Sequence, residues 1–450
     1  MELRGKRCRM GDLNHWIFRN LFYLTLVLRG EWFLSRLQEL NRTQYLDDEG
    51  LRDIQLKRLN KLLKHASENV AFYQGHIPVS LHSLDELSGL PFLEKDQLRR
   101  HKEALTYRYG ASQRSKTSGG STGAPVTLIK DARGMAQEMA AMWRGYSWAD
   151  VRIGERQARF WGVPRNGKDR ARASLIDFVC NRERVTAFEY NAETMRASVE
   201  TIRRFNPDYF YGYTSILKEF AEAQPDRRVL QPKAIITTSE VLMPADRHLL
   251  ESTFNAQVFD EYGCGEVGTI AHECAYGNKH VNAENVIVEV VDSEGAPVAD
   301  GETGELVVTD LTNYSMPLIR YRIKDFGAVR YTSCPCGRGL PVLSEIHGRA
   351  YDALINSRGS KFHGEFFLYI LEDLKKQGIA IEGVQFIQNT DSSLWIAVKC
   401  EPNDFAIVEK FLIHRLRESF DERLPVVVEW VSSIPREPSG KLRVVKRMNE

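Results

Sequence analysis

The chain has 450 residues, of which 43% are hydrophobic, 10% aromatic and 27% charged, as is typical of a soluble folded protein with more than one domain. The 61 lysines and arginines balance the 60 aspartates and glutamates, so the net charge is +1. Because this balance gives no overall positive field, we expect no nucleic-acid partner. Seven irregularly spread cysteines do not suit a secreted disulfide framework and favour a cytoplasmic protein.

The N-terminus contains a candidate targeting segment, in which basic residues precede the nine-residue apolar run NLFYLTLVL at 20–28. A spanning helix needs roughly 20 apolar residues. No small-residue cleavage site follows, so we expect neither a spanning helix nor a signal peptide. We predict a helix that packs on the body of the protein. The alternative is a helix lying at a membrane interface, which would place the protein at the periphery of the inner membrane.

Apolar residues between Leu51 and Ala66 recur at helical spacing, which predicts an amphipathic surface helix ending near Asn69. From about residue 100 to 330, strand-like runs alternate with helical stretches and glycine turns. This alternation predicts a large α/β body. The runs are AIITT at 234–238, VIVEVV at 286–291 and ELVVT at 305–309.

A shorter series of elements follows residue 348. It comprises a helix over 365–376, strands VQFIQ and LWIAVKC, a helix over 404–419, and strand PVVVEWV. Roughly 100 residues in this order suffice for a separate domain. We therefore predict an α/β fold with a large N-terminal domain over 1–347 and a small C-terminal α+β domain over 348–450.

A glycine-rich loop, KTSGGSTGAP, occupies residues 116–125. Glycines let backbone N–H groups converge on a phosphate, and hydroxyl groups add further donors. It is not a Walker loop, because no lysine follows Gly123. On composition alone, an ordinary flexible loop explains the segment equally well.

A second glycine pattern, GCGEVG at 263–268, matches the dinucleotide motif GxGxxG. A Rossmann unit requires a helix of ten or more residues directly afterwards. Gly277 and Asn278 interrupt the chain too soon, and the strand VIVEVV follows. We therefore expect no nicotinamide cofactor.

Four later segments follow the glycine-rich loop in a fixed order: YGCGE at 262–266, YRIKD at 321–325, GRAYD at 348–352 and PREPSGKLR at 435–443. Together with TSGGSTGAP they resemble the motifs of the adenylate-forming superfamily of acyl-CoA synthetases and adenylation domains. Within it the chain looks most like the phenylacetate-CoA ligase and CapK branch. QLKRLNKLLKHASENVAFYQ and LPFLEKDQLRRH are similar to the opening helix and lead-in of that branch.

The resemblance implies an AMP-forming ligase. A carboxylate attacks the α-phosphate of ATP to give an acyl-adenylate and pyrophosphate, and coenzyme A is the expected acceptor. The alternative acceptor is an amine, on a sugar of a surface polysaccharide. A third reading is a non-catalytic scaffold that keeps the fold. The active site would lie between the two domains, and the resemblance is compatible with a homodimer.

The resemblance also implies roles for the nucleotide-binding residues. Glu266 would bind Mg²⁺, a hard cation that prefers carboxylate and phosphate oxygens. Tyr262 would lie beside the adenine, and Asp325 would accept hydrogen bonds from the ribose hydroxyls. The other residues expected at the nucleotide are Ser118, Gly119, Gly120, Ser121, Thr122, Gly123, Ser239, Glu240 and Gly263.

The C-terminal motifs imply the catalytic roles. Arg349 would reach the ribose or a phosphate, and Lys441 would place its ammonium on the reacting carboxylate and α-phosphate. Tyr351 stands at the hinge about which the two domains would rotate between half-reactions. For the acid we expect a pocket that suits an aromatic or planar substrate. Its predicted lining residues are Trp161, Tyr211, Gly212 and Tyr213.

Three motifs depart from the usual pattern of the superfamily. Gly120 replaces a common threonine, and Val126 replaces a lysine that the phenylacetate-ligase branch also tends to lack. Lys324 stands where glycine is usual, so we expect it to weaken or redirect the contacts of the ribose carboxylate. Tyr351 replaces the usual aspartate or lysine at the hinge.

Two cysteine-containing segments suggest a metal site. Cys274 and His280 lie in HECAYGNKH, and Cys334 and Cys336 form a CPCG turn. Three thiolates and one imidazole suit a closed tetrahedral structural Zn²⁺ site. The alternative is that each is a separate buried thiol. The phenylacetate-ligase branch is similar in carrying a CxCG turn, which favours zinc. Substitute ligands would be Cys264 and His272.

Overall fold

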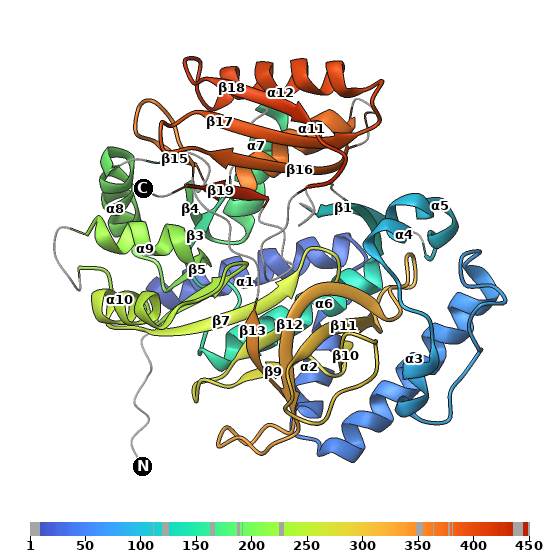
Figure 1. The fold of residues 1–450 in the computed structure, drawn as a ribbon. Coiled ribbons are helices and arrows are strands. Elements are labelled where there is room, and N and C mark those ends of the chain that lie inside the picture. The colour runs from blue at the N-terminus through green and yellow to red at the C-terminus, as the bar shows by residue number, and fades with distance from the viewer. Residues whose placement is uncertain are drawn as a thin grey trace, which may run out of the picture.

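A computed structural model shows a large body built around one long sheet, with a smaller C-terminal part above it in Figure 1. This arrangement confirms the predicted fold class. The described residues are 10–110, 112–118, 126–162, 167–186, 190, 192–224, 229–347, 354–362, 364–376, 379, 381–434 and 444–448.

Helices precede the sheet in the chain. The predicted amphipathic helix is α3, which is capped at its start by the Asp47 carboxylate accepting from the Gly50 N–H at 2.9 Å. It ends at Asn69, as predicted, and its leucine face is buried. The helices of this region are α1 (Met10–Leu28), α2 (Phe33–Thr43), α3 (Asp48–Asn69), the 3-10 helix η1 (Leu84–Gly89), α4 (Lys95–Arg100) and α5 (Lys102–Leu105).

Helix α1 confirms only part of the packing prediction. Phe22 and Leu26 are buried, and the Phe22 ring lies 5.8 Å from that of Trp143. The opposite face is exposed, with Trp16 54% and Leu28 77% accessible. No helix within the described residues is long and apolar enough to cross a bilayer.

The large sheet has 11 strands in the order β10-β11-β12-β13-β9-β8-β7-β6-β5-β3-β4. Strands β3 to β7 form a parallel half. Strands β5 and β6 are buried throughout, as is typical of parallel strands covered by helices. The elements are α6 (Ala132–Trp148), β3 (Gln157–Trp161), α7 (Gly167–Val179), β4 (Arg182–Thr186), α8 (Ala192–Phe205), β5 (Tyr209–Tyr213), α9 (Thr214–Glu222), β6 (Ala234–Thr238), α10 (Pro244–Phe254) and β7 (Gln257–Cys264).

The other half of the sheet is antiparallel. The GxGxxG segment forms the turn between β7 and β8, which pair as a hairpin, so the Rossmann reading was rightly rejected. Gly263 is required there, because a Cβ would lie 2.3 Å from the Gly268 carbonyl oxygen. The strands are β8 (Gly268–Glu273), β9 (Lys279–Val281), β10 (Val286–Val291), β11 (Gly304–Asp310), β12 (Tyr321–Arg330) and β13 (Val342–His347).

The C-terminal part has its own four-stranded sheet, β18-β17-β16-β19, and its own buried core. The predicted helices and strands are confirmed, whereas the short strands β14, β15 and β19 were missed. A pair of backbone hydrogen bonds between Tyr190 and Lys361 joins this part to the body. The elements are β14 (Leu354–Ile355), β15 (Lys361–Phe362), α11 (Gly364–Lys376), β16 (Ile381–Gln388), β17 (Leu394–Cys400), α12 (Phe405–Ser419), β18 (Val426–Trp430) and β19 (Val445–Arg447).

The predicted boundary between residues 347 and 348 adjoins a segment outside the described residues, so it stays a prediction.

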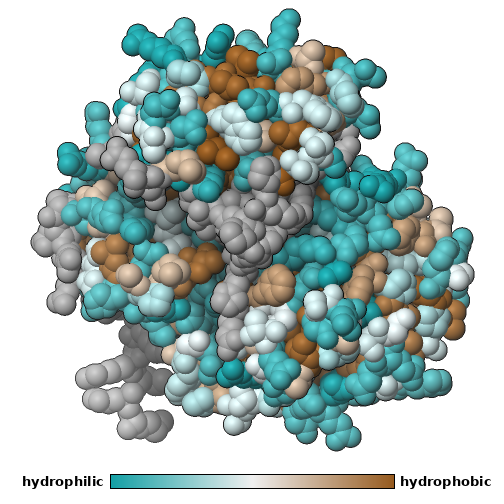
Figure 2. Space-filling model, viewed as in Figure 1, coloured by the Kyte–Doolittle hydropathy of each residue, from teal (hydrophilic) through white to brown (hydrophobic). Residues whose placement is uncertain are grey.

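Hydrophilic side chains cover much of the face in Figure 2, and hydrophobic residues form small groups among them.

Candidate active site

A hairpin presents the glycine-rich loop. Strands β1 (Gln113–Ser118) and β2 (Val126–Asp131) pair antiparallel, and the last pair of the register is Ser118 with Val126. The two ends of the loop are therefore fixed side by side. The loop residues Gly119, Gly120, Ser121, Thr122 and Gly123 lie outside the described residues, as does the side chain of Ser118. Their phosphate contacts stay a prediction.

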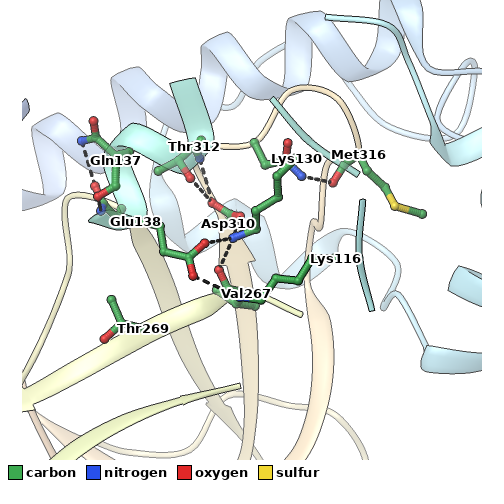
Figure 3. Close-up of polar contacts among 12 residues, drawn as sticks. Lys116, Lys130, Gln137, Glu138, Val267, Thr269, Asp310, Thr312 and Met316 are labelled. Carbon is green, nitrogen blue, oxygen red and sulfur yellow. Dashed lines mark hydrogen bonds and ion pairs between the residues drawn. The ribbon is translucent and has the colours of Figure 1, made fainter. Parts of the chain in front are cut away.

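An ion-pair network around the buried Lys130 ties this hairpin to the body (Figure 3). Lys130 on β2 is 1% exposed; its ammonium lies 2.7 Å from Glu138 Oε2 on α6 and donates to the Val267 carbonyl at 2.6 Å. Lys116 on β1 binds the other carboxylate oxygen of Glu138 at 3.1 Å. One carboxylate thus holds both strands beside the β7–β8 turn.

The electrostatics of the network keep Glu138 ionised. Burial alone would raise its pKa, but the ammonium groups of Lys116 and Lys130 outweigh burial and lower it to about 2. The close approach of Glu138 also requires glycine at position 268, where φ is +103° and a Cβ would lie 2.5 Å from the carboxylate carbon. The network is therefore a permanent structural feature.

Glu266, the predicted Mg²⁺ ligand, is buried at the β7–β8 turn. Its Oε1 lies 2.9 Å from the ammonium of Lys95, the first residue of α4, and both side chains are about nine-tenths buried. Lys95 was not predicted, because its segment LPFLEKDQLRRH resembles the family lead-in and carries no local sign of a partner at position 266. The available signal was a lysine in a segment that resembled the family.

The predicted ribose and adenine residues meet. The Tyr262 hydroxyl on β7 donates to Asp325 Oδ2 on β12 at 2.9 Å, although 63 residues separate them. Lys324, expected to disturb this carboxylate, instead pairs with Glu94 at 3.2 Å and Glu305 at 3.4 Å. Its φ is +65°, which is uncommon for a residue with a Cβ.

Ser239 and Glu240 follow β6, at the carboxyl end of the parallel strands, where ligands bind in open α/β sheets. Ser239 has a φ of +67°. The Glu240 carboxylate accepts from the backbone N–H and the hydroxyl of Ser215, at 2.7 and 3.0 Å, in the first turn of α9. Glu240 therefore anchors that helix, and nucleotide contact by either residue stays a prediction.

The residues predicted to line the acid pocket form a cluster. The ring of Trp161 lies 4.1 Å from that of Tyr213 and 5.8 Å from that of Tyr211. Gly212 lies between β3 and β6, where a Cβ would be 2.3 Å from the Phe160 carbonyl oxygen. Strand packing thus explains Gly212, whereas the three aromatic residues gather at one end of β3 and β5.

Three predicted catalytic or hinge residues, Arg349, Tyr351 and Lys441, lie outside the described residues. Their roles stay predictions.

The burial of Lys130 was also not predicted, since it depends on contacts with α6 and the β7–β8 turn that the sequence does not reveal.

The predicted cysteine cluster does form. The candidate ligand atoms of Cys274, His280, Cys334 and Cys336 all lie within 4.8 Å of one another. The register of β9 and β13 pairs Val342 with His280, which brings the two segments together. The substitutes are elsewhere: the Cys264 sulfur accepts from the Val267 N–H, and His272 Nε2 bonds Thr269 Oγ1.

The distances within the cluster suit a tetrahedral metal. Zn–S bonds of about 2.3 Å place two ligand sulfurs about 3.8 Å apart, and the Sγ atoms of Cys274 and Cys334 are 3.8 Å apart. Cys336 Sγ lies 3.2 Å from His280 Nε2. His280 Nδ1 lies 2.9 Å from the Leu340 carbonyl oxygen, a contact that fixes the ring and directs Nε2 at the thiols. The residues present therefore fit zinc.

Comparison with known proteins supports the motif assignments. A family model described as AMP-binding enzyme matches residues 117–314, and one described as CapK C-terminal domain matches residues 354–448. The chain is 26% identical to phenylacetate-coenzyme A ligase of Thermus thermophilus over 69% of this chain and 73% of that protein. It is 22% identical to Protein CapK of Staphylococcus aureus over 95% of this chain and 96% of that protein.

Solved structures show the same fold. The crystal structure of 2-hydroxyisobutyryl-CoA ligase with 2-HIB-AMP and CoA in the thioesterification state has a TM-score of 0.59, at 19% identity, over 90% of this chain and 92% of that chain. The two family models, the ordered motifs and the relatives agree. The chain belongs to the adenylate-forming superfamily, in the branch that contains phenylacetate-CoA ligases and CapK.

Proposed function

We propose that this protein is an AMP-forming ligase that activates a carboxylic acid with ATP and passes the acyl group to coenzyme A. The carboxylate oxygen attacks the α-phosphorus, the bond to the β-phosphate oxygen breaks, and pyrophosphate leaves. The thiolate of coenzyme A then attacks the acyl carbon, and AMP leaves. The supporting observation is the contact between Tyr262 and Asp325, which joins two family motifs beside Glu266.

The described residues have specific tasks in this reaction. Asp325 would accept hydrogen bonds from the ribose, and Tyr262 would orient it. Glu266 would hold Mg²⁺, which supplies positive charge against the phosphate oxygens. Lys441 would stabilise the charge that develops on the α-phosphate. The relative orientation of the two domains would change between half-reactions, with the hinge at Tyr351.

A second acceptor is favoured by the C-terminal match. The CapK C-terminal family model covers residues 354–448, and the CapK relative aligns over 95% of the chain. The phenylacetate-CoA ligase relative aligns over 69%. The alternative proposal is therefore transfer to an amine, on a sugar of a surface polysaccharide. Both proposals share the adenylation step.

ATP–pyrophosphate exchange with a mixed acid library tests the first step. We expect acid-dependent exchange that Glu266→Gln abolishes and that Glu302→Gln, at an exposed position, leaves unchanged. Exchange that is absent with every acid would favour the scaffold reading. Adding coenzyme A and measuring thioester then separates the two acceptors.

We propose that the cysteine cluster binds a structural Zn²⁺. Three thiolates and one imidazole leave no coordination position for a substrate, so the ion would stabilise the fold without taking part in the reaction. The fit of the 3.8 Å Sγ–Sγ distance supports this assignment.

We also propose peripheral attachment to an anionic membrane through the exposed side of α1 and α7. Phe18 and Phe178 join the two helices at a ring distance of 5.7 Å. Arg172 provides an exposed cation beside this surface, and the exposed Arg29 lies there too, with its Nε 3.3 Å from the buried Glu31 carboxylate. Its exposed apolar residues are Trp16, Ile17, Leu24, Val27, Leu28, Trp32, Leu175, Ile176 and Phe178.

Sedimentation with vesicles tests the attachment. We expect binding to phosphatidylglycerol vesicles that Leu28→Ser with Trp32→Ser weakens at least tenfold. Protein that stays in the supernatant and elutes as a homodimer, with the same variant monomeric, would assign the surface to a second copy of the chain.

A further inference from the structure

Arg159 lies inside the aromatic cluster assigned to the acid. It stands in the middle of β3, opposite Tyr211 of β5 in the strand register. Its guanidinium carbon is 4.8 Å from the centre of the Tyr211 ring and 4.9 Å from that of Trp161. Two of the predicted pocket residues therefore hold the guanidinium by cation–π contacts.

This guanidinium differs from its neighbour on β4. Arg184, which pairs with Arg159 in the register, donates two hydrogen bonds of 2.8 Å to the Asp177 carboxylate. Arg159 has no such carboxylate within the described residues, and its buried Nε has no hydrogen-bond partner there. The residue as a whole is partly exposed, although its Nε is buried.

The described surroundings of Arg159 supply little negative charge to balance the guanidinium. Burial lowers the pKa of Arg159, and the positive charges of Arg182 and Arg184 lower it further. Arg159 also acts on the buried Glu261 carboxyl, whose pKa burial raises to about 7, so this acid is only partly ionised near neutral pH. His272 lies near Glu261, 4.0 Å away, and burial keeps it neutral. A cation held in these surroundings favours an anion from outside the chain.

We propose that Arg159 recognises a second anionic group on the substrate, so that the acid carries a carboxylate at each end. This inference rests on the proposed function. The reacting carboxylate meets the nucleotide beyond the carboxyl ends of the strands, where Tyr262 and Glu266 lie. Arg159 is two residues before Trp161, the last residue of β3, so it meets the far end of the substrate.

The chemistry of guanidinium suits this task. Its planar edge donates two parallel N–H bonds to a carboxylate, whereas its faces contact the aromatic rings. Trp161 and Tyr211 would hold the carbon skeleton of the acid. A monocarboxylic acid would leave the guanidinium without an anion, so the site selects against it.

Matched acids test the proposal by binding and by turnover. The panel pairs each dicarboxylate from succinate to suberate, and 4-carboxyphenylacetate, with the monocarboxylate of the same skeleton. We expect one dicarboxylate to bind the protein without ATP at least tenfold more tightly than its partner. In acid-dependent pyrophosphate release, its kcat/KM should exceed that of its partner at least a hundredfold.

Variants assign the preference to Arg159. Arg159→Met should reduce the preference to less than threefold by lowering the kcat/KM of the dicarboxylate, without lowering that of the monocarboxylate. Arg159→Lys should restore only part of it, since an ammonium lacks the fork of two donors. Arg156→Met, which removes the same charge just before β3, should leave it unchanged.

The two measurements separate this proposal from the proposed function. Binding that depends on Arg159 without pyrophosphate release would support the anion site and overturn the ligase. Pyrophosphate release with no dicarboxylate preferred, or a preference that survives in Arg159→Met, would overturn the anion site and leave the ligase in place.

Discussion

The cysteine cluster lies in the antiparallel half of the sheet, whereas the candidate nucleotide site combines β7, the last strand of the parallel half, with β12 of the antiparallel half. The cluster gathers ligands from two segments that β9 and β13 hold together by hydrogen bonds. The nucleotide site takes Tyr262 and Glu266 from one hairpin and Asp325 from β12. Its catalytic lysine is expected from the C-terminal segment.

The difference lies in the partners. The thiols and imidazole of the cluster face one another, so one metal ion would satisfy all four. At the nucleotide site, Glu266 pairs with Lys95, and Asp325 accepts from Tyr262. In the proposed mechanism Mg²⁺ and the ribose would bind these same carboxylates, so each contact would be exchanged or shared when the nucleotide binds. In the proposed zinc site every ligand would stay bound to the ion. In the proposed nucleotide site each carboxylate is paired with a protein group that Mg²⁺ or the ribose would replace.

The largest effect is expected from substitution of Lys441, the proposed catalytic lysine. Lys441→Ala should lower acid-dependent pyrophosphate exchange at least a hundredfold and leave the KM for ATP within several-fold, because its ammonium meets charge that develops in the transition state. Lys446→Ala, on neighbouring β19, is the control and should keep full activity. Wild-type exchange in Lys441→Ala would remove this lysine from the catalytic role.

Removing one ligand of the cysteine cluster should cost both the metal and fold stability. Cys336→Ser should lose the metal and lower the melting temperature by roughly 5–10 °C, since a closed thiolate site contributes folding free energy directly. Elemental analysis and differential scanning calorimetry measure both. Cys180→Ser, another partly buried thiol outside the cluster, should change neither. Tag-free wild-type protein without near-stoichiometric zinc would contradict the assignment.

A smaller effect is expected from substitution of Lys95, the ion-pair partner of Glu266. When Mg²⁺ takes Glu266, the buried ammonium of Lys95 needs another anion, and an ATP phosphate can supply it. Lys95→Met should therefore raise the KM for ATP about tenfold while kcat changes little. Lys102→Met, at an exposed position on α5, serves as the control. A lower KM would mean that Lys95 only competes with Mg²⁺.

The sequence predicted what is local or ordered along the chain. Helix α3, the buried strands and the C-terminal elements follow from periodicity, and Glu266, Tyr262 and Asp325 follow from ordered motifs. Charge partners between distant segments carry no such signal. Lys130 reads as a polar residue of an alternating strand, yet it is buried because Glu138 and Val267 approach it in space. The proposed role of Arg159 likewise depends on its contacts with the Trp161 and Tyr211 rings, which the sequence does not indicate.

The smallest expected effect concerns Glu261, a buried acid on β7 that forms no ion pair with a lysine or arginine among the described residues. Tyr146 donates to its carboxyl at 3.4 Å, and burial raises its pKa from 4.5 to about 7. In the unfolded chain it ionises near pH 4.5, so between about pH 4.5 and 7 the native state binds more protons than the unfolded state. Stability contributed by the neutral acid is therefore full below pH 4.5 and is lost as the pH rises through 7. The melting temperature of the wild type should fall between pH 5 and pH 8, and in Glu261→Gln this fall should be smaller by about 2–4 °C. Wild-type and variant melting curves that fall in parallel over this range would show that Glu261 is ionised in the folded protein, and hence that a partner compensates its charge as Lys95 does for Glu266.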